Sequence, residues 1–346
     1  MNSIVGGEFE IDIKIIRNSS PKLPKKLNHG HFYSSGRAAL FHILNFSSQS
    51  GKNKILLPDY LCESIIEVVK LASVQYKFYT INQDLSLNIN SINELFDTES
   101  SILIINYFGV IDIRSEIQKI KNLDSSAFII LDNVQSLYSM FESFDVDFMF
   151  TSFRKQLPVP DGAWVVSKHS ELFQCEEENT FSQYKLAGGL LKNYQEFDVF
   201  SDQLYLELFE KGENLIIKNI NSKISNITLS ILSVLDFDLI RQKRINNAMI
   251  IINGLQTMEI TPIIKFQVNT VPLFVPILIK NRDLLRLELR KNNIYCPVHW
   301  PKSKEINIKN DNLYNSELSL IIDQRYDQKV MNKILSIIAR LVNNGK

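Results

Sequence analysis

The residues best suited to chemistry in this 346-residue chain follow stretches that read as buried strands. Asp132 comes directly after the apolar run 128–131 (FIIL). A carboxylate at a strand end can hold a cationic ring nitrogen through a charge-assisted hydrogen bond, but it can equally cap a helix or bind a ribose. Lys155 follows the next apolar strand, three residues after Ser152 and beside Arg154. A partly desolvated lysine can form a Schiff base, whereas most lysines are solvated surface residues.

Two further segments could contact a ligand. Ser35, Gly36 and Arg37 precede an Ala-Ala-Leu helix start, and small residues at a helix N-terminus present free backbone N–H groups to a phosphate. The alternative is an ordinary helix start with Ser35 as its N-cap. His299 and Trp300 lie late in the chain, where they could contact a substrate across a cleft between domains. His299 could equally be a loop histidine whose hydrogen bonds are all made within the protein.

The composition excludes several classes of protein. Lysine and arginine together number 38, as do aspartate and glutamate, so no overall field draws the chain to nucleic acid or to an anionic membrane. An apolar fraction of 45% with 22% charged residues is typical of a globular protein and excludes a disordered chain or a fibre. No apolar run is long enough for a membrane span, and the N-terminus does not read as a signal peptide. We therefore expect a cytoplasmic protein with no membrane span that binds no nucleic acid.

The cysteines and histidines do not indicate a metal site. Cys62, Cys175 and Cys296 are widely spaced and odd in number, which fits a reducing compartment rather than a disulfide framework. The five histidines form no ligand spacing with cysteines or acids. The absence of a G-x-S-x-G motif leaves a serine hydrolase unsupported, and the absence of G-x-G-x-x-G argues against an NAD-binding dehydrogenase.

The elements that would position these residues alternate between apolar strands and amphipathic helices. Strands are expected at 54–57, 76–81, 102–106, 128–131, 148–151 and 164–166, with helices at 63–72, 91–96 and 114–121. Strands that are apolar throughout, separated by helices, indicate a mostly parallel sheet covered on both faces. In such an α/β sheet, ligands gather outside the carboxyl ends of the strands, where Asp132 and Lys155 would lie.

The length and the later pattern predict two domains. From about 181 to 255 the pattern is helical, and a strand at 274–279 and helices at 283–291 and 327–342 follow. We expect a large domain of residues 1–250 and a smaller C-terminal α/β domain of residues 251–346, with the N-terminal segment 1–28 free to pack elsewhere.

The order of these segments resembles the fold-type I pyridoxal-phosphate (PLP) enzymes and, more narrowly, the DegT/DnrJ/EryC1/StrS family of sugar aminotransferases. Residues 35–40 (SGRAAL) match the phosphate segment SGTxAL of that family, Asp132 with Gln135 matches its D-x-x-Q/H pair, and 161–163 (DGA) match its E/D-G-G segment. Further matches are residues 55–60, Tyr107-Phe108-Gly109 and 318–326. The resemblance covers nearly the whole chain and implies an aspartate aminotransferase-like fold, with a mostly parallel sheet in the large domain.

Several positions depart from the family pattern. Arg37 replaces the threonine of the phosphate segment, which loses a hydroxyl but adds a cation suited to phosphate. Cys62 stands where many members have an aromatic residue that stacks on the cofactor ring, so ring contact would come from its sulfur, or from Tyr60 if the alignment slips. Asn221 and Lys223 stand where the N-Y-R-x-S segment of the family reaches the site of the neighbouring subunit.

The resemblance implies a role for each candidate residue. Lys155 would hold PLP covalently and Asp132 would keep the ring nitrogen protonated, so the cofactor acts as an electron sink. The implied cofactor contacts are Ser35, Gly36, Arg37 and Ser152 at the phosphate, Cys62 and Gln135 at the ring, and Asn221 and Lys223 from the partner subunit. The implied substrate contacts are Tyr107, Phe108, His299 and Trp300.

The activity implied by the resemblance is a transamination. A homodimer would move an amino group, with glutamate as the donor, to a nucleotide-linked keto-sugar in surface polysaccharide or glycoside biosynthesis. Two other functions stay open: a PLP lyase or dehydratase, in which relatives carry histidine in place of Lys155, and a non-catalytic PLP-binding regulator or partner protein. The departures at Arg37 and Cys62 give weight to the non-catalytic reading.

Overall fold

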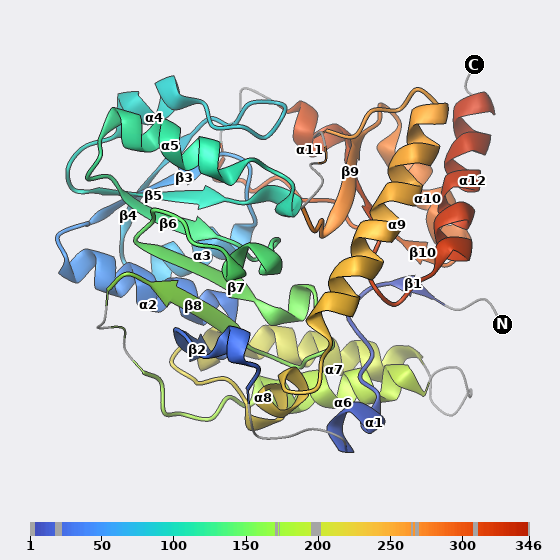
Figure 1. Ribbon diagram of the computed structural model, residues 1–346, viewed down its shortest axis with the longest axis horizontal. Coiled ribbons are helices and arrows are strands. Elements are labelled where there is room, and N and C mark those ends of the chain that lie inside the picture. The colour runs from blue at the N-terminus through green and yellow to red at the C-terminus, as the bar shows by residue number, and fades with distance from the viewer. Residues whose placement is uncertain are drawn as a thin grey trace.

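The fold is built around one large sheet and a smaller C-terminal layer (Figure 1). The structure is a computed structural model that describes residues 4–17, 23–169, 172, 174–194, 202–263, 266, 270–306 and 311–344. In these ranges no helix combines the length and the apolar character that crossing a membrane requires.

The large sheet has seven strands in the order β2-β8-β7-β6-β5-β3-β4. Strands β3 to β7 run parallel, while β8 is antiparallel to both of its neighbours, β7 and β2. The strands are β2 (His31–Tyr33), β3 (Lys54–Pro58), β4 (Gln75–Tyr79), β5 (Ser100–Ile105), β6 (Phe128–Asp132), β7 (Phe148–Ser152) and β8 (Ala163–Ser167). The predicted mostly parallel α/β sheet is thus confirmed.

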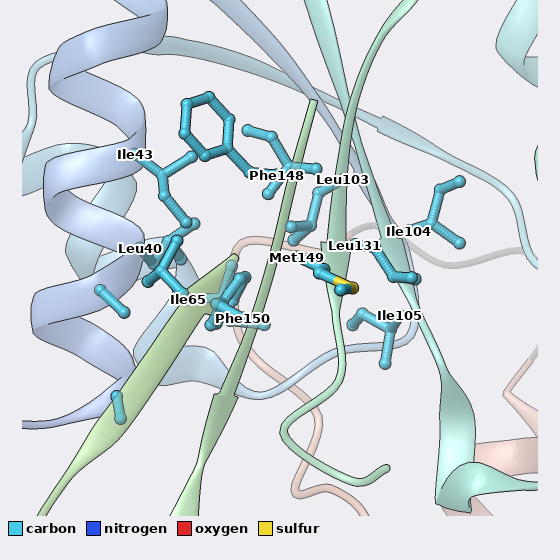
Figure 2. Close-up of a cluster of buried hydrophobic side chains, with 14 of the residues drawn as sticks. Leu40, Ile43, Ile65, Leu103, Ile104, Ile105, Leu131, Phe148, Met149 and Phe150 are labelled. Atoms are coloured by element: carbon cyan, nitrogen blue, oxygen red, sulfur yellow. The ribbon is translucent and has the colours of Figure 1, made fainter. Parts of the chain in front are cut away.

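Helices cover both faces of this sheet, which explains why its central strands are apolar throughout. In Figure 1, α4 and α5 lie on one side of the sheet and α2 lies on the other. Figure 2 shows how Leu40 and Ile43 of α2 point toward Phe148 of β7 in the buried core. The helices are α2 (Gly36–Gln49), α3 (Glu63–Leu71), α4 (Ile89–Leu95) and α5 (Ile113–Leu123).

A helical section follows the sheet, as the sequence predicts for residues 181–255. It consists of α6 (Phe181–Asn193), α7 (Asp202–Leu215), α8 (Asn226–Leu232) and α9 (Phe237–Thr257). Helices α6 and α7 pack closely because Gly188 has no side chain. A Cβ there would lie 2.8 Å from the Phe209 ring.

The C-terminal layer contains a second hydrophobic core. Its strands are β9 (Phe274–Leu278), β10 (Ile294–Tyr295) and β11 (Glu317–Ile321), and its helices are α10 (Arg282–Lys291), α11 (Asn312–Ser316) and α12 (Gln328–Asn344). Strand β11 pairs antiparallel with β9. The two hydrophobic cores divide within α9, between Ile240 and Ala248.

The start of the chain packs against this C-terminal layer. Strand β1 (Val5–Gly6) pairs parallel with β10, and Val5 belongs to the second core. Helix α1 (Ile13–Arg17) follows it. The strand patterns at β1, β2 and β10 span only two or three residues, too few for a periodicity to be read from the sequence.

Candidate active site

A cavity of about 610 Å³ lies where the large sheet meets the C-terminal layer. Its walls come from the carboxyl ends of β6 and β7, the N-terminus of α2, residues 6–9, helix α10 and the loop 295–300. Its size is within the range of small-molecule and cofactor sites. Most of the residues singled out in the sequence meet in this cavity.

The N-terminus of α2 forms one end of the cavity. Ser35 is the N-cap, and its Oγ accepts a hydrogen bond from the Ala38 N–H at 3.1 Å. Ser35 can therefore cap the helix while the same helix start binds a phosphate, because the backbone N–H groups of the first turn still point out of the helix. A Cβ on Gly36 would lie 3.4 Å from Ser152 Cβ, so the absence of a side chain leaves room at the helix start beside β7.

Asp132 lies at the end of β6, with 4% of its surface exposed. Its Oδ1 accepts a hydrogen bond from the Val134 N–H at 2.8 Å. Burial raises the pKa of Asp132 to about 7, against the opposing effects of the Val134 N–H and of Lys155. A positively charged N–H group in the cavity would therefore stabilise the ionised carboxylate, because its charge would compensate for the hydration that burial removes.

Lys155 ends the short 3-10 helix η4 (Phe153–Lys155), which begins one residue after β7. Its side chain lines the cavity and is exposed. In the described part of the chain it makes no hydrogen bond or ion pair, and its charge acts on both Asp132 and His299. An amine in this position can react with a carbonyl group that enters the cavity.

Gln135 lines the cavity and also braces the loop behind it. Its Oε1 accepts a hydrogen bond from the Phe108 N–H at 2.8 Å, which supports the left-handed backbone of Phe108 at φ 57°. The Tyr107 hydroxyl donates to the Tyr60 carbonyl. Tyr107 and Phe108 are buried and do not line the cavity, so the geometry gives these two residues a supporting position behind the site.

Cys62, not Tyr60, reaches the cavity. Tyr60 is buried at 1% exposure, where its ring packs edge-on against Trp300 with centroids 5.2 Å apart. Trp300 and its neighbour His299 both line the cavity. Of Cys62 and Tyr60, the two residues that the sequence offers for contact with a cofactor ring, Cys62 is therefore the one that can make it. Ser64 Oγ donates a hydrogen bond to the Cys62 sulfur at 3.1 Å.

A cluster of charges surrounds the start of α2. Glu213 of α7 forms ion pairs with Arg37, with Arg154 at 3.2 Å and with Lys185 at 3.0 Å. Glu8 pairs with the same Lys185 at 2.6 Å and with Arg154 at 3.5 Å. Although burial opposes its ionisation, the charges of Arg154, Lys185 and Arg37 hold the pKa of Glu213 well below its usual range. Three cations face two acids, so the cluster favours an anion at the N-terminus of α2.

No pattern in the sequence points to Glu8, Lys185 and Glu213 as residues of the site. They come from three segments far apart in the chain, and a long-range ion pair leaves no local pattern. Only the structure makes the pairing evident, because a lysine with 1% of its side chain exposed needs an acidic partner.

The outer wall of the cavity carries arginines from α10. Arg286 and Arg290 line it, four residues apart and so on one face of the helix. Neither forms an ion pair with the described residues, whereas Arg325 nearby is held by Asp323 at 2.8 Å and by Glu10 at 3.0 Å. The burial of Arg286 and the charge of Arg290 lower the pKa of the Arg286 guanidinium, as expected for cations that lack an anion.

Asn221 and Lys223 do not line the cavity of their own chain. The Lys223 ammonium pairs with Glu178 at 2.7 Å, and Asn221 is exposed. The adjacent Ser222 carbonyl accepts from the Ser34 N–H at 2.9 Å, which ties this segment to the strand that leads into Ser35. The expectation that both residues contact the cofactor in the site of a neighbouring subunit stays a prediction.

Comparison with known proteins identifies the fold. No protein-family model and no curated protein sequence matches the chain. Among solved structures, it is similar to the Helicobacter pylori aminotransferase PseC, involved in the biosynthesis of pseudoaminic acid, with a TM-score of 0.71 and 15% identity over 99% of each chain. The putative sugar aminotransferase Spr1654 from Streptococcus pneumoniae, in its PMP form, has a TM-score of 0.69 and 13% identity over 99% of this chain and 98% of that chain.

A third neighbour carries the family name that the motifs suggest. It is a DegT DnrJ EryC1 StrS aminotransferase from Brucella abortus, with a TM-score of 0.65 and 16% identity over 91% of this chain and 86% of that chain. At these identities the likeness establishes the architecture, and the chain thus has the fold of the DegT/DnrJ/EryC1/StrS aminotransferases.

Proposed function

We propose that this protein is a PLP-dependent aminotransferase. The observation that carries the proposal is that one cavity brings three groups together. They are the amine of Lys155, which has no ion-pair partner among the described residues, the buried carboxylate of Asp132, and the N-terminus of α2 with its net positive cluster of side chains. These groups match the three reactive features of PLP, which are an aldehyde, a ring nitrogen and a phosphate. The similar structures, several of them sugar aminotransferases, support the same function.

The residues present fit this cofactor. The N-terminus of α2, with Ser35, Gly36 and the hydroxyl of Ser152, would hold the phosphate. Asp132 would hold the ring nitrogen in its protonated form, and Cys62 and Gln135 would lie at the ring. When bound, PLP supplies an electron sink for the carbanion that forms at the donor carbon.

The protein contributes orientation and proton movement. Lys155 would fix the cofactor and then, as a free amine, carry the proton between the donor carbon and the cofactor. In the overall exchange the donor gives up its amino group and becomes a keto acid, while the acceptor keto-sugar becomes an amino-sugar. We take glutamate as the donor, a homodimer as the active form and the cytoplasm as its location, in surface polysaccharide or glycoside biosynthesis.

The outer wall supports an acceptor that carries a diphosphate. Arg286 and Arg290 lack acidic partners among the described residues and lie on the cavity wall. One guanidinium group can donate two parallel hydrogen bonds to the oxygens of a phosphate. A nucleotide-linked keto-sugar would place its sugar in the cavity and its diphosphate against these arginines.

Three measurements test the proposal. Borohydride reduction of the PLP-loaded protein, followed by peptide mapping, should place a pyridoxyl group on Lys155. Incubation with glutamate should bleach the visible absorption band, and mass spectrometry with a panel of nucleotide-linked keto-sugars should detect the aminated product. A label on another lysine would refute the assignment, and a band that glutamate leaves unchanged would favour a non-catalytic binding protein.

A further inference from the structure

Three polar side chains form a chain of hydrogen bonds that ends in the cavity. Glu317 and Ser319 stand two residues apart on β11 and so on one face of the strand. Both are fully buried. The Ser319 hydroxyl lies 2.5 Å from Glu317 Oε1 and 2.8 Å from His299 Nδ1. His299 lines the cavity, whereas Glu317 and Ser319 do not.

The imidazole of His299 is held in one orientation. The backbone N–H of His299 donates to Glu317 Oε2 at 2.7 Å, and the backbone N–H of Ser319 donates to the Pro297 carbonyl at 3.1 Å. Its ring packs against Phe108 and Phe274, with centroid distances of 5.5 and 5.1 Å. Nδ1 therefore stays beside the Ser319 hydroxyl, and Nε2, which makes no hydrogen bond in the described part of the chain, is the ring nitrogen left for exchange with a group in the cavity that His299 lines.

The hydrogen-bond chain can exist in two complete arrangements. With Glu317 ionised, the Ser319 hydroxyl donates to Glu317, Nδ1–H donates to Ser319, and Nε2 is an acceptor. With Glu317 protonated, its O–H donates to Ser319, the Ser319 hydroxyl donates to Nδ1, and Nε2 carries the hydrogen. Each arrangement keeps both hydrogen bonds, Glu317–Ser319 and Ser319–His299. This is possible because a hydroxyl is donor and acceptor at once, and a neutral imidazole has one donor nitrogen and one acceptor nitrogen.

We propose that Glu317, Ser319 and His299 form a proton relay that stores a proton at Glu317 and exchanges it with the cavity at Nε2 of His299. On release, the Nε2–H bond breaks and Nδ1 takes the proton of Ser319, which in turn takes the proton of Glu317. One proton leaves, Glu317 becomes a carboxylate, and His299 is neutral before and after. The relay itself is a property of these three residues, and only its use in transamination, beside Lys155, rests on the proposed function.

The electrostatics agree with this direction of proton storage. Burial raises the pKa of Glu317 to about 8, although Ser319, the His299 N–H, Arg282 and Arg286 favour its ionised form. Burial and the charge of Lys155 lower the pKa of His299 to about 3. The remaining titratable groups that act on Glu317 are Tyr60 and Cys296, and burial raises the pKa of each, so both stay neutral near pH 8. The group that titrates near neutral pH is thus the carboxyl, while the imidazole changes its tautomer.

The tautomer of His299 can be read directly by NMR of the full-length chain with ring-¹⁵N-labelled histidine. The spectrum contains five histidines, and His299→Gln identifies the relevant signals. Between about pH 6 and about pH 10, bracketing the Glu317 pKa of about 8, the protonated-type ¹⁵N shift should move from Nε2 to Nδ1. A tautomer that stays the same across this range would overturn the relay.

Variants separate a relay from a structural contact. Ser319→Ala removes the link but keeps Glu317 and its bond to the His299 N–H, and Glu317→Gln removes the titrating group. Both should abolish the pH-dependent exchange. The matched control is Ser101→Ala, which deletes a buried strand hydroxyl bonded to the Lys54 carbonyl outside the cavity and should leave the exchange unchanged. Retention of the wild-type exchange in Ser319→Ala would refute the proposal.

The same experiment distinguishes this proposal from the proposed function. The NMR measurement needs neither cofactor nor substrate. If borohydride fails to label Lys155 while the tautomer exchange is present, the aminotransferase assignment fails and the relay stands. If Lys155 is labelled and the tautomer is fixed, the relay fails and the aminotransferase assignment stands.

Discussion

Arg37 and Glu213 form an ion pair at the start of α2, although 176 residues separate them in the chain. The position of Arg37, where the family that the motifs resemble has threonine, would suggest a cation free to bind phosphate. In the structure its charge is shared with Glu213, which also pairs with Arg154 and Lys185. Arg37 therefore contributes to a net positive cluster and connects α7 to the end of the cavity formed by the N-terminus of α2.

We expect Glu213→Gln to destabilise the protein. Removing one partner of a buried ion pair typically costs about 3–5 kcal/mol. Because 40% of the Glu213 side chain is exposed, solvent screening reduces the expected loss to about 1–3 kcal/mol. Urea denaturation should show the loss, while Glu210→Gln, an exposed glutamate on the same helix, should change the free energy of unfolding very little. Equal stabilities of the two variants would contradict the central role of Glu213.

The same carboxylate gives a pH dependence. Its folded-state pKa is lower than the usual value, so its contribution to stability is present above the unfolded pKa of about 4.3 and is lost as the pH falls further. The difference in stability between wild type and Glu213→Gln should therefore shrink when the pH is lowered below about 4. A difference that stays constant would show that the variant acts through packing rather than charge.

Asp132→Asn should leave the fold intact and reduce turnover by about 10²–10⁴-fold. The amide is similar in shape but cannot balance the charge of a protonated ring nitrogen, and losing such a buried pair is worth roughly 3–5 kcal/mol. Circular dichroism checks folding and an aminotransferase assay checks turnover. The control is Glu116→Gln, another buried carboxylate, which accepts from the Leu87 N–H and lies outside the cavity. Near-normal turnover in Asp132→Asn would mean that the carboxylate is only structural.

The sequence predicts the part of the site that local patterns determine. Asp132, Ser152 and Lys155 follow two apolar strands, and adjacent parallel strands bring their carboxyl ends together. The N-terminus of α2 can also be predicted locally, because Ser35 is a typical N-cap residue and is followed by Gly36 and an Ala-Ala-Leu run. These residues could be placed in one site without knowledge of any distant contact.

The rest of the site depends on contacts that the sequence does not encode locally. Glu317 and Ser319 alternate with Leu318 and Leu320, a pattern typical of a strand with one solvated face. In the structure that polar face is buried against the loop that carries His299. The polar residues face another polar segment instead of water, and only the tertiary packing decides between these outcomes.

Replacing both arginines of the outer wall should weaken binding of a diphosphate. With inorganic pyrophosphate as the probe, Arg286→Ala/Arg290→Ala should lower affinity by about 10²–10⁴-fold, because the variant removes at least one charge-assisted hydrogen bond from each arginine and each such bond contributes about 1.5–3 kcal/mol. Calorimetric titration at low and high salt measures the effect, which should diminish with salt. Lys291→Ala is the matched control, since this cation of α10 lies outside the cavity and pairs with Glu288. Unchanged affinity in the double variant would exclude this wall as the diphosphate site.

The prediction that two subunits share each site can be tested by mixing inactive variants. Lys223 is 38% exposed in its side chain and pairs with Glu178, also exposed, so a partner phosphate could replace that acid at small cost. If Lys223 serves the neighbouring site, Lys155→Ala and Lys223→Ala should each be poorly active alone.

Mixing these subunits gives dimers in which one site carries both defects and the other carries neither. Random exchange makes about half of the dimers mixed, and activity should recover to about a quarter of the wild-type value. The control replaces Lys223→Ala by Lys218→Ala, an exposed lysine of the same segment, which should be fully active by itself. If Lys223 acts within its own subunit, every site in a mixed dimer is damaged and mixing restores no activity. A monomer by light scattering under assay conditions would reject site sharing altogether.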